Sequence, residues 1–211
     1  MQLPFLLCGP FLRRTERSGV YIWVATSEET TDITGSVFSL SKDSNGKWKE
    51  SPITIVSTCT THQLGIKLFV SLIQIKPANG GRFNVDIPYG YDLKFTLKNA
   101  VPISLFSFPQ GSKVVTPLQV FSFSTIYNHS KLLSYADMPY PVFVVPDNSK
   151  RKTSIIYGSC RRTSGPGSDA LNAADKMLAK EWDDWSPNKK QPAPAYTLFH
   201  TGDQIYTDDL S

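Results

Sequence analysis

The sequence predicts a β-sandwich over residues 1–146, followed by the start of an α/β domain over residues 153–211. Apolar and polar residues alternate through the first part, and no helical periodicity competes with that alternation. A segment rich in proline and basic residues, 139–152, separates the two parts. The second part then has a strand–helix–strand pattern, which is typical of a parallel sheet.

The strands of the first part are expected where the sequence keeps a period of two. Val20, Ile22 and Val24 share one face of a strand, and a second alternating run extends from Leu64 to Leu72 through Ile66, Leu68 and Val70. Further β-like runs span residues 31–40, 54–58, 91–98, 118–125 and 142–145. Turns are expected at Asn45-Gly46, Asn79-Gly80-Gly81 and Tyr89-Gly90. Short strands at this spacing indicate a sandwich.

In the second part, two short apolar strands flank one helix. The strands are expected at 154–160 and 196–199. The helix is expected to begin with Ser168 as its N-cap and to end near Trp185, before Pro187. Its buried face is expected to hold Leu171, Ala174, Leu178 and Trp182, which follow one another at helical spacing. A strand–helix–strand unit places its two strands parallel, so both should end at the same edge of the sheet.

Residues with metal-binding chemistry follow both strands. Cys160 ends the first strand, and Asp203 comes directly after the second, in a Gly-Asp turn. Asp203, Tyr206, Asp208 and Asp209 offer hard oxygen donors, which suit iron, calcium, magnesium or manganese. Ligands of open α/β sheets bind at this edge. The sequence therefore predicts that Cys160 and Asp203 lie together at this edge, beside a loop whose oxygen donors suit a metal ion.

Each of these residues also has a plainer interpretation. Asp203 could be a solvated acidic turn, Tyr206 a packed aromatic side chain, and Cys160 a buried thiol at a strand end. Arg161 and Arg162 follow Cys160, and a guanidinium fork suits phosphate oxygens, although a solvated loop pair is equally consistent with the pattern. His200 precedes the turn and fits a supporting role better than direct ligation.

Three stretches of the chain together resemble one known family. They are Gly9–Thr15 with Val20–Thr26, Gly158–Arg162 with Gly165–Leu171, and Phe199–Tyr206. These stretches are similar to motifs of the alkaline phosphatase D (PhoD-like) family of metallophosphoesterases. Gln204 and Thr207 stand where better-known members carry Tyr and Glu.

The resemblance implies a β-sandwich followed by a four-layered α/β phosphoesterase domain. It implies metal ligation by Cys160, Asp203 and Tyr206, with iron and calcium as the metal ions and a phosphate monoester or diester as the substrate. Family members complete the metal centre with Asn, Asp and His residues from later strands. The expectation is therefore the N-terminal part of a hydrolase that is inactive as residues 1–211 alone. The alternative is a non-catalytic β-sandwich that binds or interacts with another molecule.

Composition narrows the class of protein. Lys and Arg number 22 against 18 Asp and Glu, a net charge of +4, and no long basic run predicts nucleic-acid binding. No segment approaches the length of a membrane span. Three cysteines form no disulfide framework, and the N-terminus is a poor match to a signal peptide, so a cytoplasmic location is expected.

Overall fold

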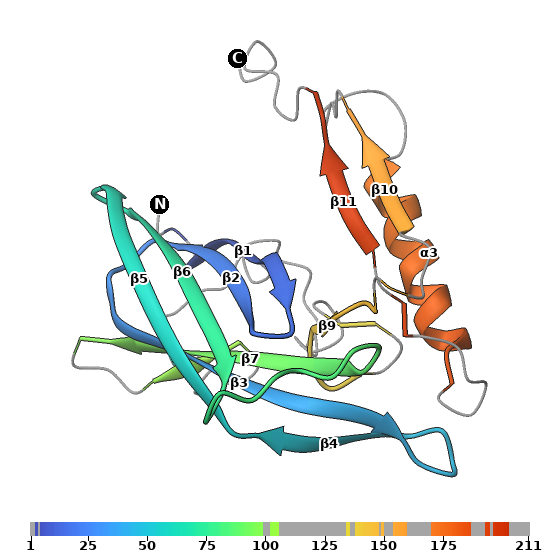
Figure 1. Ribbon diagram of the computed structural model, residues 1–211. Helices are drawn as coiled ribbons and strands as arrows, with labels where there is room; N and C mark the ends of the chain where they lie inside the picture. The colour runs from blue at the N-terminus through green and yellow to red at the C-terminus, as the bar shows by residue number, and fades with distance from the viewer. Residues whose placement is uncertain are drawn as a thin grey trace.

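The fold has two facing antiparallel sheets, and a two-stranded parallel sheet with one helix beside them (Figure 1). This computed structural model describes residues 3, 5–98, 102–105, 134–135, 138–147, 149, 154–159, 170–186, 193–194 and 196–202. The predicted strand at 118–125 lies outside these residues. None of the described helices is long and apolar enough to cross a membrane.

The first antiparallel sheet, sheet A, has the strand order β1-β2-β6-β5. Its strands are β1 (Leu6–Glu16), β2 (Gly19–Thr26), β6 (Leu68–Pro77) and β5 (Ile55–Gly65). Pro10 lies within β1, and an edge strand tolerates a residue that cannot donate to the ladder.

The second antiparallel sheet, sheet B, has the order β4-β3-β7-β8, and β9 also pairs with β7. Its strands are β4 (Trp48–Ile53), β3 (Thr30–Lys42), β7 (Pro88–Leu97), β8 (Ile103–Ser104) and β9 (Val142–Val144). Only Thr54 separates β4 from β5, so one stretch of chain passes from sheet B into sheet A.

The main core lies between the two sheets, as the sandwich prediction requires. The predicted alternation of β2 is confirmed, because Tyr21 and Trp23 are only partly buried whereas Val20, Ile22 and Val24 are all fully buried. They pack with residues of β6, β3 and β7 that include Ile73, Ile75, Ile33, Val37 and Leu93. Truncating a buried aliphatic side chain of this kind to alanine typically costs about 2–5 kcal/mol.

Gly35 of β3 lies directly against the Ile75 side chain of β6, across the space between the sheets. A Cβ atom at this position would collide with Cδ1 of Ile75, so only glycine fits beneath that side chain. The backbone N–H of Gly35 donates a hydrogen bond to Oγ of Ser57, at 3.0 Å. A side chain of β5 thus satisfies a donor on the open edge of β3, next to the point where β4 leaves it.

A second core covers the outer face of sheet B. Trp182 and Trp185, at the end of α3 (Ala170–Asp184), are buried against Leu40, Met138 and Val144. Trp48 stacks on Trp185, with ring centroids 5.7 Å apart and planes 3° apart. Nζ of Lys42 donates to the carbonyl oxygen of Trp185 at 3.0 Å and lies 4.9 Å from the ring centroid of Trp48. The helix is therefore fixed to the sandwich at its C-terminal end.

The expected strand through Leu64–Leu72 is wrong in two ways. Ile66 and Lys67 form the turn of the β5–β6 hairpin, so the run does not belong to one strand. Leu64, Leu68 and Leu72 face outward, with exposed fractions of 67%, 36% and 42%, whereas Phe69, Ile73 and Ile75 face the core. Both phases of β6 are apolar, so periodicity alone did not distinguish its inner face from its outer face.

Two of the three predicted turns are confirmed. Asn45-Gly46 joins β3 to β4, and Asn79-Gly80 follows β6, with positive φ at Gly46, Asn79 and Gly80. Tyr89-Gly90 is instead part of β7. Glycine is needed there for close packing, because a Cβ at Gly90 would lie 2.9 Å from the Cβ of Tyr140.

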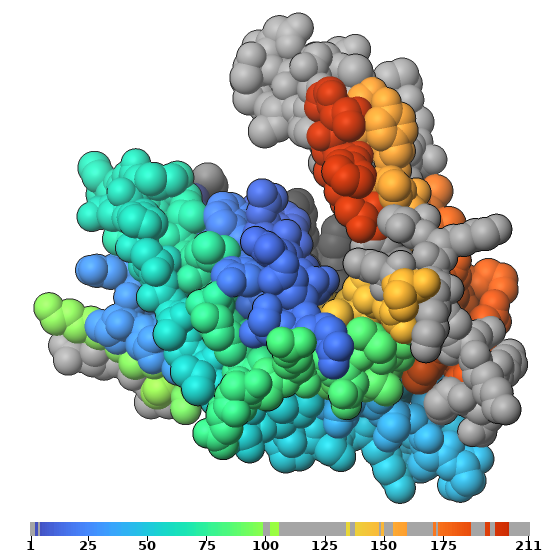
Figure 2. Space-filling view, in the orientation of Figure 1, coloured from blue at the N-terminus to red at the C-terminus, as the bar shows by residue number. Residues whose placement is uncertain are grey.

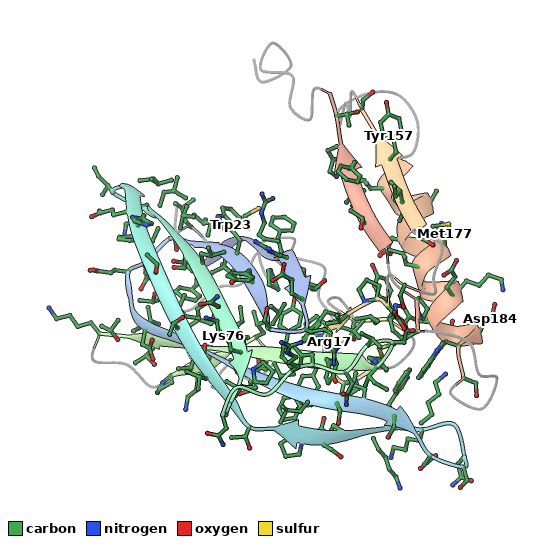
Figure 3. The ribbon with its side chains drawn as sticks, in the orientation of Figure 1. Arg17, Trp23, Lys76, Tyr157, Met177 and Asp184 are labelled. Atoms are coloured by element: carbon green, nitrogen blue, oxygen red, sulfur yellow. The ribbon has the colours of Figure 1, made fainter. Side chains whose placement is uncertain are left out.

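The outer face of sheet A has no second core among the described residues. Phe11 of β1 stacks beside Trp23 of β2, with centroids 5.8 Å apart, and Phe11 is half exposed (Figure 3). Gln74 donates a hydrogen bond to the Tyr21 hydroxyl in the next row of the sheet. The two sheets therefore differ, since sheet B is packed on both faces.

We predict that residues 1–146 fold without the rest of the chain, because the core between the sheets is drawn from that segment. Removing residues 147–211 also removes Trp182 and Trp185, and this should leave Trp48 open to solvent. The fragment should keep β-type circular dichroism and cooperative urea unfolding, with red-shifted tryptophan emission that acrylamide quenches more readily than in the whole chain. An unfolded fragment would place the domain boundary elsewhere.

A second prediction concerns Asp92, on the outer face of β7. Its Oδ1 accepts a hydrogen bond from the backbone N–H of Leu105 at 3.1 Å, yet burial raises the pKa of its carboxyl to about 6. Because the folded state holds this proton more tightly than the unfolded state, stability should fall as pH rises from about 4 to about 6, by at most about 3 kcal/mol.

Asp92→Asn should remove this part of the pH dependence, as measured by urea unfolding between pH 4 and pH 7. An unchanged slope in the variant would show that Asp92 titrates in the same range whether the protein is folded or unfolded.

Candidate metal centre

The two strands of the second part pair in parallel, as predicted. β10 (Ser154–Gly158) and β11 (Tyr196–His200) lie in register, with Gly158 opposite His200 (Figure 1). The backbone N–H of Thr201 donates to the carbonyl oxygen of Gly158 at 3.0 Å, which extends the pairing past the end of β11. Both strands therefore end at the same edge.

The expected ligands continue from this edge. Cys160 follows Ser159 in the sequence, and Asp203 follows Gly202. Cys160, Arg161, Asp203 and Tyr206 themselves lie outside the described residues. The structure thus places the end of β10 next to the end of β11, and the candidate ligands continue from these two ends. Their assignment as metal ligands remains a prediction.

Most of the other candidate site residues also lie outside the described part of the chain. Arg162, Asp208 and Asp209 lie outside the described part of the chain, as does the loop 163–168. His200 is described, and it occupies the last position of β11 with its side chain exposed. Within the described ranges no group of three or more His, Cys, Asp or Glu side chains is placed to hold a metal ion.

The helix between the strands has the predicted buried face. α3 spans Ala170–Asp184, and Leu171, Ala174 and Leu178 are partly covered while Trp182 is buried. Met177, on another face, is 42% exposed (Figure 3). Trp182 anchors the helix in the second core of the sandwich.

Both strands of the parallel sheet carry uncovered apolar side chains. The exposed fractions are 55% for Ile155, 70% for Tyr157, and 50% each for Leu198 and Phe199. Parallel sheets are normally buried on both faces, and a two-stranded sheet is rarely stable by itself. These side chains are apolar, as in the interior of a parallel sheet, yet they are exposed on the surface of the described structure.

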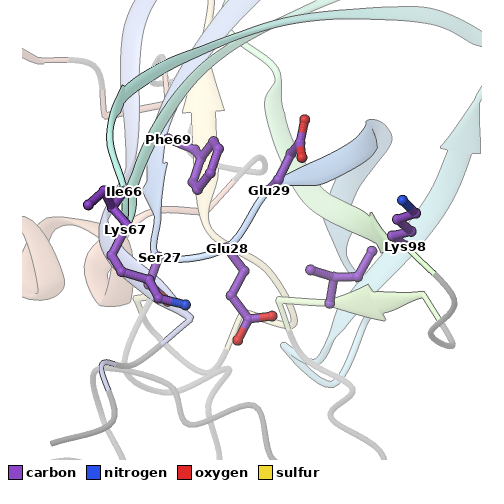
Figure 4. A pocket seen from close by; sticks show the side chains of 8 residues that line it. Ser27, Glu28, Glu29, Ile66, Lys67, Phe69 and Lys98 are labelled. Atoms are coloured by element: carbon purple, nitrogen blue, oxygen red, sulfur yellow. The ribbon is translucent and has the colours of Figure 1, made fainter.

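A separate hollow of about 410 Å³ lies at the other end of the sandwich (Figure 4). It is lined by Ser27, Glu28, Glu29, Ile66, Lys67, Phe69, Leu97 and Lys98. The two carboxylates and two amines are all exposed, and they come from the β2–β3 turn, the β5–β6 turn and the end of β7. Sequence reasoning did not single out these residues, because they share no motif. Among these described lining residues there is no histidine or cysteine.

Comparison with known proteins adds no relative. No protein-family model, no curated protein and no solved structure matches the chain.

Proposed function

We propose that this chain is the N-terminal part of a metal-dependent phosphoesterase that hydrolyses phosphate monoesters or diesters. The observation that carries the proposal is the parallel pairing of β10 with β11, with Gly158 opposite His200. This pairing supports a shared site for Cys160 and Asp203, because each follows its strand within two or three residues of that pair.

The donor set fits a hard, strongly polarising metal ion. Asp203 would supply a carboxylate, Tyr206 a phenolate and Cys160 a thiolate, and phenolate ligation suits ferric iron, with calcium as a partner ion. When bound, such ions lower the pKa of a water molecule and neutralise charge on phosphoryl oxygens.

Arg161 would bind the substrate. Its guanidinium group can donate two parallel hydrogen bonds to phosphate oxygens, which orients the ester next to the ligands. The proposed role of the sandwich is structural, since it holds α3 through Trp182 and Trp185 and thereby holds the parallel sheet.

In this proposal residues 1–211 supply only the first ligands. The exposed apolar side chains of β10 and β11 support it, because the remaining layers of an α/β domain would cover the faces of the sheet.

One observation favours the alternative, a non-catalytic binding module. The outer face of sheet A carries the Phe11–Trp23 pair beside hydrogen-bonding side chains, and flat surfaces with exposed aromatic rings often serve in recognition. On this alternative the sandwich binds its ligand without any metal.

The proposal predicts that Asp203→Asn loses bound metal and phosphoesterase activity together, in a polypeptide that continues past Ser211 through a whole α/β domain. Metal content is measured by elemental analysis, and activity with para-nitrophenyl phosphate and its bis-ester. Tyr206→Phe should abolish a visible phenolate-to-iron absorption band. Residues 1–211 alone should show no turnover with added iron, calcium, manganese or zinc.

His200→Gln provides a matched control at the same edge, and it should keep most of the metal. Full metal content in Asp203→Asn would contradict the proposed ligand. Turnover by purified residues 1–211 that disappears in Asp203→Asn would show that the 211 residues already contain a complete centre.

A further inference from the structure

The edge strands of the sandwich differ in how they are protected against pairing with another chain. Exposed strand edges are usually blocked by proline, by charged side chains or by short length. β1 contains Pro10, Arg13 and Arg14, and β4 contains Lys49, Glu50 and Pro52. β8 and β9 have only 2 and 3 residues.

β5 has none of these protections. It is 11 residues long, and its sequence, IVSTCTTHQLG, contains no proline and no Asp, Glu, Lys or Arg. Among the described strands its only ladder partner is β6, with regular pairing from Ile55 to Gln63. Its β-branched residues favour extended structure. In the space-filling view the β5–β6 hairpin stands out from the rest of the sandwich (Figure 2).

The side chains of β5 are also self-complementary. Its two exposed large apolar residues are Val56, at 55%, and Leu64, at 67%. Val56 lies four residues before Thr60 on the same outward face, and Leu64 lies four residues after it, at the irregularity in the pairing with β6 between Gln63 and Gly65. If two copies pair antiparallel about a two-fold axis at Thr60, Val56 of one copy lies opposite Leu64 of the other, on both sides of the axis.

Other registers lose this match. Thr58 and His62 are the next positions on the same face. If the axis lies at Thr58, Val56 falls opposite Thr60 and Leu64 falls opposite a position outside β5. If the axis lies at His62, Leu64 falls opposite Thr60 and Val56 falls opposite a position outside β5. The Thr60 register also pairs Thr58 with His62, so no like charges meet at the junction.

We propose that β5 is a homodimer interface, in which two copies of this chain join their β5 edges antiparallel about Thr60 and extend sheet A across both sandwiches. The backbone N–H and C=O groups on the outer edge of β5 then find partners, and Val56 and Leu64 pack across the junction. The proposal is independent of any metal site or enzymatic activity.

The inner side chains of β5 are engaged within the sandwich. Ser57 accepts the hydrogen bond from Gly35, and Thr61 bonds to Ser71 of β6, so both are turned into the sandwich. Cys59 is half-buried between them. The outward row, Val56 to Leu64, is exposed at every second residue.

Sedimentation velocity of the whole chain at micromolar concentrations tests the proposal. The wild-type chain should sediment as a dimer. Thr60→Glu places two carboxylates beside the axis and should weaken dimerisation on the order of 100-fold. Thr34→Glu is the matched control, because Thr34 is an exposed strand threonine on β3, opposite Lys94, and it should leave the dimer intact.

Crosslinking tests the register without depending on a disruptive charge. In Thr60→Cys the two introduced thiols would face each other within disulfide reach, so this variant should give a covalent dimer on mild oxidation. Val56→Cys should not exceed the wild-type background from Cys8 and Cys59, because its two copies would lie roughly 26 Å apart.

A monomeric wild-type chain, a Thr60→Glu variant that dimerises like wild type, or equal crosslinking at positions 56 and 60 would each overturn the proposal.

Discussion

The close approach of the two sheets at Gly35 is the constraint on which the sandwich depends. Ile75 occupies the space that a Cβ atom at position 35 would need, so a larger residue there would require Ile75 to move or the two sheets to separate. Gly35 also donates its N–H to Ser57, which sets where β5 begins after the chain leaves sheet B. The position of the exposed β5 edge therefore follows from a buried contact.

The two sheets have different surroundings because only one of them meets the helix. The outer face of sheet B is covered by Trp182 and Trp185, and Lys42 holds the C-terminal end of α3 through the Trp185 carbonyl. In the sequence α3 lies between β10 and β11, so the anchored helix belongs to the same strand–helix–strand unit as the ends from which Cys160 and Asp203 continue.

Much of this architecture was predictable from local patterns. Val20, Ile22 and Val24 identified an inner face because Tyr21 and Trp23 contrast with them in polarity and shape, and the helix was bounded by its spacing and by Pro187. Parallel pairing of β10 and β11 followed from the right-handed strand–helix–strand rule.

The wrong predictions concern features that depend on residues distant in the sequence, about which a local pattern carries no information. β6 is apolar on both faces, so its buried phase depends on which residues lie opposite in sheet B. Gly90 has the signature of a turn residue, yet Tyr140, fifty residues later in the sequence, is what requires it to be small. The candidate site was predictable as far as the strand edge; the ligand set there came from motif resemblance, and those residues lie outside the described part of the chain.

The passage from β4 to β5 through Thr54 makes the two sheets share one continuous stretch of chain. Pulling β4 out of sheet B would pull on β5, whose Ser57 caps the neighbouring edge of β3. Neither sheet can open far while the other stays intact, so the sandwich should behave as a single cooperative unit in native-state hydrogen exchange. Among the described strands β10 and β11 pair only with each other, so their amides should exchange independently of the sandwich.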